Sequence, residues 1–366
     1  MKIAPFIYGA RPKTLTASIA PVLAGSACAW GVISSNIHCN IGGRVSREVL
    51  QYACLNNSAS FDLIRSCFFH IVVLCLISAV GLQIFANYAN DYWDGVYGRD
   101  SKRVEPMSVT GKPVRMVASG KVSPRAMLCA SIIAACVACV AGLIAVIISR
   151  QYWLLIVGVS ALLSAWLYSS GNQPYSKYGL GEIVAAIFFG PVAMLGTQYL
   201  IVQYLNTSNV MYVHNIMLFS NTFSGDWFMQ ASYGINIVSL FISVCIACNA
   251  VLLMMINNLR DIDDDLQNGK VTLVGHLGKP KSITVFLVVV ITEMLLSLCV
   301  LLFLLSVMLS TDAFRQAVVF LVWMAQILML GLIIRNIRNN NYEYAFNLVS
   351  MHNVLSIVYI VVALVG

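Results

Sequence analysis

The feature that most constrains this chain is a series of long apolar runs. A helix needs about 20 mostly apolar residues to cross the hydrocarbon core of a bilayer, and runs of that kind predict about nine membrane-spanning helices here. The predicted spans are residues 14–34, 67–90, 126–149, 152–169, 179–203, 232–257, 283–309, 314–334 and 346–366. Arg150 and Gln151 mark a tight hairpin between the third and fourth spans, because these two runs together are too long for one crossing.

Composition agrees with a chain whose solvent is lipid. Of its 366 residues 59% are hydrophobic and only 10% are charged, whereas soluble domains carry about 25% charged residues. Because backbone polar groups in lipid must bond within their own segment, we predict an all-α polytopic membrane protein with a single domain over residues 1–366. Most of the 11 cysteines lie in apolar runs, where they act as small hydrophobes. The sequence leaves open whether Cys39, Cys54 and Cys67 form a disulfide.

The basic residues show which face of the membrane is cytoplasmic. Most of the 22 Lys and Arg residues lie in the N-terminal segment and in the loops 91–125, 170–178, 258–282 and 335–345, which share one face. On the other face lie only Arg44, Arg47, Arg65, Arg150 and Arg315. The positive-inside rule therefore predicts a cytoplasmic N-terminus. The net charge of +7 reflects this basic face, and no module typical of nucleic-acid binding is present.

Two acidic clusters follow the second and the sixth predicted spans. They read NDYWDGVYGRD at 90–100 and NNLRDIDDD at 257–265. Four crossings separate them, so both emerge on the cytoplasmic side, where they can face each other. In each cluster amides and carboxylates recur at helical steps of three and four residues, which places them on one helix face. These are Gln83, Asn87, Asn90, Asp91 and Asp94 in the first, and Asn257 or Asn258, Asp261, Asp264 and Asp265 in the second.

Like charges on one helix face near the membrane need a counter-charge. Mg²⁺ prefers one or two carboxylates together with substrate phosphate oxygens, so two facing clusters predict a diphosphate held by Mg²⁺. Nearby basic residues could take its remaining charge. They are Arg99, Lys102, Arg103, Lys112, Arg115, Lys121, Lys177, Arg260 and Lys270. An EF-hand is excluded, because Leu266 stands where that loop needs glycine and Thr272 where it needs glutamate.

These clusters resemble the two Asp-rich motifs of the UbiA-type intramembrane prenyltransferases, the second extending to NNLRDIDDDLQNGKVTLVGHLG. Four further stretches resemble the 1,4-dihydroxy-2-naphthoate prenyltransferase branch, which serves menaquinone biosynthesis. They are ARPKTLTASIAPVLAGS at 10–26, GKPVRMVASG at 111–120, YSSGNQPYSKYGLGE at 168–182 and FFGPVAMLGTQY at 188–199. The spacing supports this branch, because Gly98 stands where 4-hydroxybenzoate enzymes carry a third Asp, and the next acid is Asp100. The loops 35–66 and 203–231 are longer than the family leads one to expect.

The resemblance implies a helix bundle around a central cavity under a cytoplasmic cap, in the cell inner membrane. It implies transfer of a polyprenyl group from a prenyl diphosphate to 1,4-dihydroxy-2-naphthoate, with loss of CO₂ and diphosphate. Carried over residue by residue, the Mg²⁺ and diphosphate ligands are Asn90, Asp91, Asp94, Asp261 and Asp265. The residues implied in binding diphosphate or the aromatic acid are Arg11, Lys13, Asp100, Arg115, Lys177, Asn257, Asn258 and Arg260, with Tyr168, Tyr175 and Tyr178 in the cap.

Two alternatives remain at this point. The first is the same enzyme class acting on another acceptor, such as 4-hydroxybenzoate, homogentisate or a haem vinyl group. The second is a cation transporter whose acids line a pathway. A transporter accounts for acids at membrane depth, but not for the surrounding basic residues or for two clusters at one face instead of the midplane.

Overall fold

The computed structural model describes residues 3–42, 57–99, 114–171, 173–208, 235–269, 271–308 and 313–365, and each regular element in these ranges is helical, as predicted. The elements are α1 (Ala4–Gly9), η1 (Pro12–Thr14), α2 (Thr16–Gly42), α4 (Asn57–Val96), α6 (Pro124–Ser149), α7 (Leu154–Leu167), η2 (Tyr175–Tyr178), α8 (Gly181–Ile187), η3 (Phe188–Val192), α9 (Ala193–Thr207), α10 (Ile237–Gln267), α11 (Leu273–Met308), α12 (Ala313–Arg338) and α13 (Tyr342–Val365). Outside the described residues lie Asp100, Lys102, Arg103, Lys112, Lys270 and Cys54.

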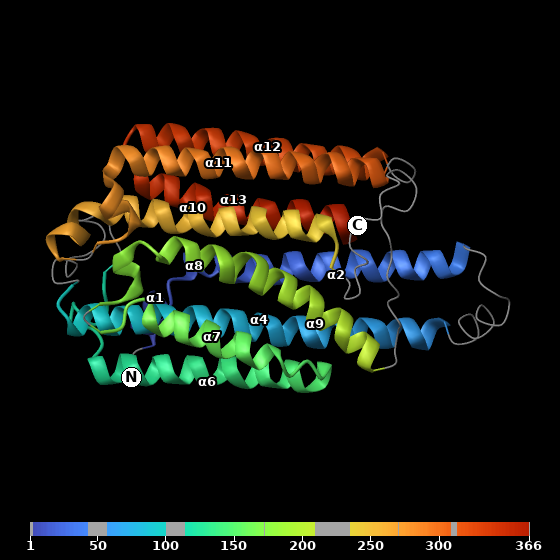
Figure 1. Cartoon of the computed structure of the whole chain (residues 1–366), viewed down its shortest axis with the longest axis horizontal. Coiled ribbons are helices and arrows are strands. Elements are labelled where there is room, and N and C mark those ends of the chain that lie inside the picture. Colours follow the sequence, from blue (N-terminus) through green and yellow to red (C-terminus); the bar gives the residue numbers. More distant parts are fainter. Residues whose placement is uncertain are drawn as a thin grey trace.

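The long helices run side by side in one bundle (Figure 1). Within the described ranges, eight helical segments are long and apolar enough to cross a membrane, and α8, η3 and α9 together form one of them. The fourth predicted span corresponds to α7, which has only 14 residues and a length of about 21 Å, less than the roughly 30 Å of a hydrocarbon core. The predicted count of nine full-length crossings is therefore not confirmed.

Local sequence explains where several helices begin and end. The predicted hairpin between the third and fourth spans is confirmed: α6 ends at Ser149, and Arg150 adopts a left-handed backbone with φ 55°. Ser123 caps the start of α6 by accepting a hydrogen bond from the backbone N of Ala126. Asn236 caps α10 in the same way, through Ser239 N at 2.8 Å.

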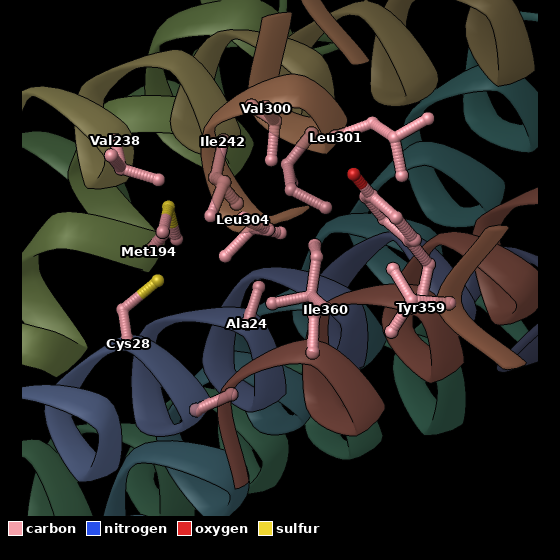
Figure 2. Packing of buried hydrophobic residues seen from close by; sticks show 14 of the residues in the cluster. Ala24, Cys28, Met194, Val238, Ile242, Val300, Leu301, Leu304, Tyr359 and Ile360 are labelled. Carbon is pink, nitrogen blue, oxygen red and sulfur yellow. The ribbon is translucent and has the colours of Figure 1, made fainter. Parts of the chain in front are cut away.

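Apolar side chains from α2, α9, α10, α11 and α13 interdigitate in the interior (Figure 2). Glycine permits the closest helix approaches. A Cβ at Gly190 would lie 2.8 Å from the carbonyl oxygen of Ser243, so η3 packs directly against α10. Large apolar side chains also point outward, as do Ile132 and Ile133 on α6, which is typical of a surface that contacts lipid.

The two helices that carry the acidic clusters end at the same end of the bundle. The C-terminal ends of α4 and α10 both lie at the left of Figure 1. Both clusters therefore lie at one end of the bundle, as the count of crossings between them predicted, and they can contribute to one site.

Candidate active site

The first acidic cluster is buried on the last turns of α4. Asn90, Asp91 and Asp94 are all buried, with only 1% of Asp94 exposed. The Asn90 amide nitrogen donates to Oδ2 of Asp94 at 3.1 Å. Oδ2 of Asp91 accepts a hydrogen bond from the backbone N of Met116 at 3.1 Å. The helical spacing thus forms one continuous polar face.

Three arginines from separate parts of the chain contact this face. Arg11 donates through Nη2 to Oδ1 of Asn90 at 2.8 Å, and Arg115 reaches the same oxygen at 3.4 Å. Arg99 forms a buried ion pair with Asp94, with Nη1 3.3 Å from Oδ1. Arg99 also donates to the backbone carbonyls of Ser169 and Gly171. Asp94 is therefore paired with a fixed cation, and the two guanidinium groups that bond the neutral amide of Asn90 favour an anionic ligand.

Arg11 is held in place by its backbone as well as by its side chain. It adopts a left-handed conformation with φ 53°, just before η1, a region that non-glycine residues occupy at a cost. Asn87 on α4 supports this turn by donating to the carbonyl of Ala10 at 2.8 Å and to Oγ1 of Thr14 at 3.2 Å. The turn before α2 is thus fastened to the first acidic cluster.

The second cluster lies on the C-terminal half of α10. Asp261, Asp265 and Asn258 face inward and are buried, with only 1% of Asp261 exposed. Asp263 points outward, with a side chain that is 67% exposed and paired with Lys279 at 2.8 Å. The run of acids at 261–265 is thus divided by helix geometry into an inward and an outward set.

Arg260 covers the second cluster. Its Nε lies 2.9 Å from Oδ1 of Asp261, and its Nη2 lies 3.1 Å from Oδ2. The same Nη2 donates to Oδ1 of Asn257 at 2.7 Å. The guanidinium also lies over the ring of Phe346, 5.4 Å from its centroid. Arg260 therefore neutralises the charge of Asp261, its neighbour in sequence.

Glu182 was not predicted as a site residue. It is buried at the start of α8, and its Oε1 accepts a hydrogen bond from Nδ2 of Asn258 at 2.8 Å. The only signal in the sequence was its place at the end of YSSGNQPYSKYGLGE, since it is a single acid outside both clusters. The structure adds it to the second cluster as a carboxylate from a third helix.

Tyr168 connects the two clusters. Burial raises the pKa of its phenol, and the charges of Glu182, Asp94 and Asp265 raise it further, against a lowering by Arg11. The charges of carboxylates on α4, α8 and α10 thus all act on this one phenol. Its ring packs edge-to-face on Tyr175, with centroids 5.7 Å apart, and burial raises the pKa of Tyr175 as well. Of the predicted cap tyrosines, Tyr168 is therefore the one influenced by the acids, and Tyr175 packs against it.

The remaining predicted residues also contact groups outside the two acidic clusters. Lys13 is exposed and donates to Oδ1 of Asn347 at 2.8 Å, which links the turn before α2 to α13. The backbone carbonyl of Lys177 lies 2.7 Å from Nε2 of His276. The hydroxyl of Tyr175 donates a hydrogen bond to the carbonyl of Ser164 at 3.0 Å. Tyr178 is exposed.

The arrangement fits a hard divalent cation that arrives with its substrate. Among the residues described, no three His, Cys, Asp or Glu side chains already form a metal-binding group. Oδ1 of Asp91 is buried, and no described residue donates a hydrogen bond to it. Since Mg²⁺ takes only one or two protein carboxylates and completes its shell with phosphate oxygens and water, such a carboxylate suits it.

Comparisons with known proteins place the chain among prenyltransferases. Residues 52–353 match the UbiA prenyltransferase family. The chain is 32% identical over 280 residues to the 1,4-dihydroxy-2-naphthoate octaprenyltransferase of Mycobacterium tuberculosis, covering 76% of this chain and 72% of that one. It is 29% identical over 276 residues to the protein of the same name from Escherichia coli, covering 74% and 67%. A solved UbiA homolog from Archaeoglobus fulgidus bound to GPP and Mg²⁺ is 14% identical, with a TM-score of 0.49, covering 97% of this chain and 99% of that one.

Proposed function

Since this chain belongs to the UbiA prenyltransferase family, we propose that it transfers a polyprenyl group from a polyprenyl diphosphate to 1,4-dihydroxy-2-naphthoate. The reaction releases CO₂ and diphosphate and yields demethylmenaquinone in its reduced form. The acceptor is supported by the names of the relatives at 32% and 29% identity and by Gly98 in the first motif. The proposal places the enzyme in the cell inner membrane, with its site on the cytoplasmic side.

The observation that carries the proposal is that two buried acidic clusters lie at one end of the bundle, each with an acid that is paired with arginine. The proposed diphosphate and Mg²⁺ ligands are Asn90, Asp91, Asp94, Asp261 and Asp265. When bound, Mg²⁺ neutralises the charge that develops on the leaving diphosphate and polarises its oxygens. Buried carboxylates on two facing helix ends suit that ion better than a solvated loop does.

The arginines bind the oxygens of the diphosphate. Arg11 and Arg115 already point at one amide oxygen, that of Asn90, and a guanidinium donates well to phosphate in a bidentate manner. Arg260 exchanges its bonds to Asp261 for bonds to the incoming diphosphate. This exchange leaves the Asp261 carboxylate available at the moment when the metal and the diphosphate arrive together.

Apolar side chains near the acids protect the prenyl cation from water. The allylic C–O bond breaks with its electron pair leaving on the diphosphate, and the ring carbon that bears the carboxylate attacks C1 of the prenyl cation. The bond to the carboxyl group then breaks, CO₂ departs, and its electron pair restores the aromatic ring. Buried apolar side chains beside the acidic face, such as Met255 and Ile256, exclude water that would capture the cation. Tyr168 stays a neutral phenol, so it serves as a hydrogen-bond donor.

An acceptor comparison tests this proposal. Membranes that contain the protein are given one labelled polyprenyl diphosphate with 1,4-dihydroxy-2-naphthoate, 4-hydroxybenzoate or homogentisate in parallel. We expect a prenylated product of the expected mass only with the naphthoate. Turnover with a different acceptor alone would overturn the substrate assignment. Mg²⁺ flux into liposomes without release of diphosphate would favour the transporter alternative.

A further inference from the structure

Arg99 is buried beside the first acidic cluster, and the function proposed above assigns it no step. Its side chain is only 7% exposed, and Nη1 lies 3.3 Å from Oδ1 of Asp94. The same Nη1 donates to the backbone carbonyl of Ser169 at 3.0 Å, and Nη2 donates to the carbonyl of Gly171. One side chain therefore joins the end of α4 to the segment that follows α7.

The segment that Arg99 contacts is residues 168–171, which we call the cap turn. It begins with Tyr168, whose phenol is influenced by the acids of both clusters, and Ser169 is 2% exposed. Gly171 adopts a left-handed backbone with φ 68°, and a Cβ there would meet nothing within 4 Å. This glycine is therefore favoured by its backbone conformation, which forms part of the turn that presents two carbonyls to one guanidinium.

The chain just before Arg99 is shaped for this contact. Gly98 adopts φ 68°, and the backbone N of Arg99 donates to the carbonyl of Asp94 at 2.8 Å. This is the Schellman arrangement that a glycine permits after a helix C-terminus, and it returns the chain over the last turn of α4. The guanidinium also lies over the ring of Tyr97, 4.9 Å from its centroid. Backbone and side-chain contacts thus fix Arg99 beside Asp94.

Arg99 differs from Arg260 in the groups that hold it. The contacts of Arg260 described above are with side chains, namely those of Asp261, Asn257 and Phe346. Arg99 instead donates to two backbone carbonyls as well as to a carboxylate. Those two hydrogen bonds do not depend on whether the carboxylate binds another cation. A substrate that displaces Arg260 therefore leaves the backbone contacts of Arg99 in place.

We propose that Arg99 is a positioning residue that clamps the cap turn to Asp94 and keeps this contact when substrate binds. This inference rests on the proposed function, in which Asp94 is a ligand of the diphosphate-bound Mg²⁺. Arg99 holds Oδ1 of the carboxylate, while the amide of Asn90 donates to Oδ2 at 3.1 Å. Asp94 is thus oriented through both oxygens, and the same clamp holds Tyr168 within the influence of the acids.

Direct contact with the diphosphate is the rival role for Arg99. The structure favours positioning, because Asp94 balances the charge of the guanidinium and both terminal nitrogens already donate to carbonyls. Arg11, by contrast, donates to the neutral amide of Asn90. A positioning residue acts on kcat, whereas a residue that binds the donor in its ground state acts on KM. Kinetics therefore distinguish the two roles.

The kinetic test is Arg99→Gln in the full chain, at saturating Mg²⁺. We expect kcat to fall by about tenfold or more, because a misplaced group lowers the rate of the chemical step. The KM for the prenyl diphosphate should change by less than about threefold. Arg99→Lys should recover only part of the loss, since one ammonium cannot reproduce the planar fork that reaches both carbonyls.

The control for these kinetics is Arg125→Gln, an exposed arginine at the start of α6, which should keep the wild-type kcat. A rise in KM with an unchanged kcat in Arg99→Gln would overturn the proposal in favour of direct contact with the diphosphate. Wild-type values of both constants would overturn it as well.

Amide hydrogen exchange tests the clamp without any substrate, in the detergent-purified full chain. Peptides that contain residues 168–171 should exchange about threefold faster or more in Arg99→Gln, because the turn loses the donors that hold its carbonyls. Arg125→Gln should exchange at the wild-type rate in the same peptides. An unchanged rate in Arg99→Gln would contradict the clamp. Because no substrate is present, this result does not depend on which acceptor the enzyme uses.

A second variant decides the matter if Arg99→Gln does not fold. Gly171→Ala keeps Arg99 and strains only the left-handed backbone of the cap turn, so the same peptides should exchange faster. Gly120→Ala is the matched control, since Gly120 has φ 69° and equally open surroundings but lies in a different turn. Equal exchange of the cap turn in these two variants would contradict the proposal. Variants of Asp261 test the proposed function separately, so the two proposals fail independently.

Discussion

Arg260 holds the carboxylate of its own neighbour, Asp261, through two nitrogen–oxygen contacts of 2.9 and 3.1 Å. Both side chains are nearly buried, with 10% and 2% exposed. A charge-assisted contact of this kind fixes the orientation of the carboxylate. In the proposed function, Arg260 turns from Asp261 to the diphosphate when the substrate binds.

Removing an inward acid should abolish turnover. We expect Asp261→Asn and Asp94→Asn to lose about 100-fold or more in kcat, because each removes a charge where the leaving group ionises. Asp263→Asn is the matched control, since that acid is exposed and paired with Lys279, and it should keep wild-type activity. Turnover of labelled prenyl diphosphate measures both. Normal activity in Asp261→Asn would remove this residue from the site.

The turn before α2 should matter for donor binding. Arg11→Gln loses the guanidinium that reaches Asn90, and we expect the KM for the prenyl diphosphate to rise about tenfold or more, the cost of one charged hydrogen bond. Arg125→Gln replaces an exposed arginine at the start of α6 and serves as the control. An equal KM in the two variants would show that Arg11 does not contact the diphosphate.

Chelation should stop the reaction reversibly. With EDTA in excess we expect turnover to vanish, and to return when Mg²⁺ or Mn²⁺ is added, because carboxylates alone cannot neutralise a leaving diphosphate. A parallel thermal-unfolding scan serves as the control and should show that the protein stays folded in EDTA. Sustained turnover in EDTA would rule out a divalent cation.

The tyrosine between the clusters should give a signature at alkaline pH. Burial and the neighbouring carboxylates raise the pKa of Tyr168 above its ordinary value of 10.0. The folded protein therefore keeps this proton where the unfolded chain has lost it, so the stabilising contribution is complete below pH 10 and is lost as pH rises towards the folded pKa. Above pH 10 the Tm of wild type should fall more steeply than that of Tyr168→Phe.

The control for this measurement is Tyr178→Phe, because Tyr178 is exposed and should leave the wild-type slope unchanged. Identical slopes in wild type and Tyr168→Phe would show that Tyr168 is not held as a neutral phenol.

The sequence predicted the helical architecture and the placement of both acidic clusters at one end of the bundle, because span length and the number of crossings between two motifs can be read from the sequence. It predicted the inward set Asn90, Asp94 and Asp261 because helical spacing alone places them on one face. The shortness of α7 was missed, since Tyr152 and Trp153 extend the apolar run beyond the helix that forms. Apolar composition gives the length of an apolar run, but it does not show at which residue the helix within that run begins.

Residues whose position depends on distant parts of the chain could not be predicted. Glu182 joins Asn258 only because α8 packs on α10. Arg99 was one of many basic residues until its contacts with Asp94 and the carbonyl of Ser169 placed it in the interior.

The central claim is that the acids of α4 and α10 form one diphosphate site. A structure of the protein with an unreactive prenyl thiodiphosphate, and with Mn²⁺ in place of Mg²⁺, tests it most directly. We predict one diphosphate whose bound metal contacts carboxylates from both clusters, including Asp94 and Asp261, with Arg260 turned from Asp261 to the phosphate. A diphosphate bound by only one cluster, with the other still closed by its arginine, would contradict the claim.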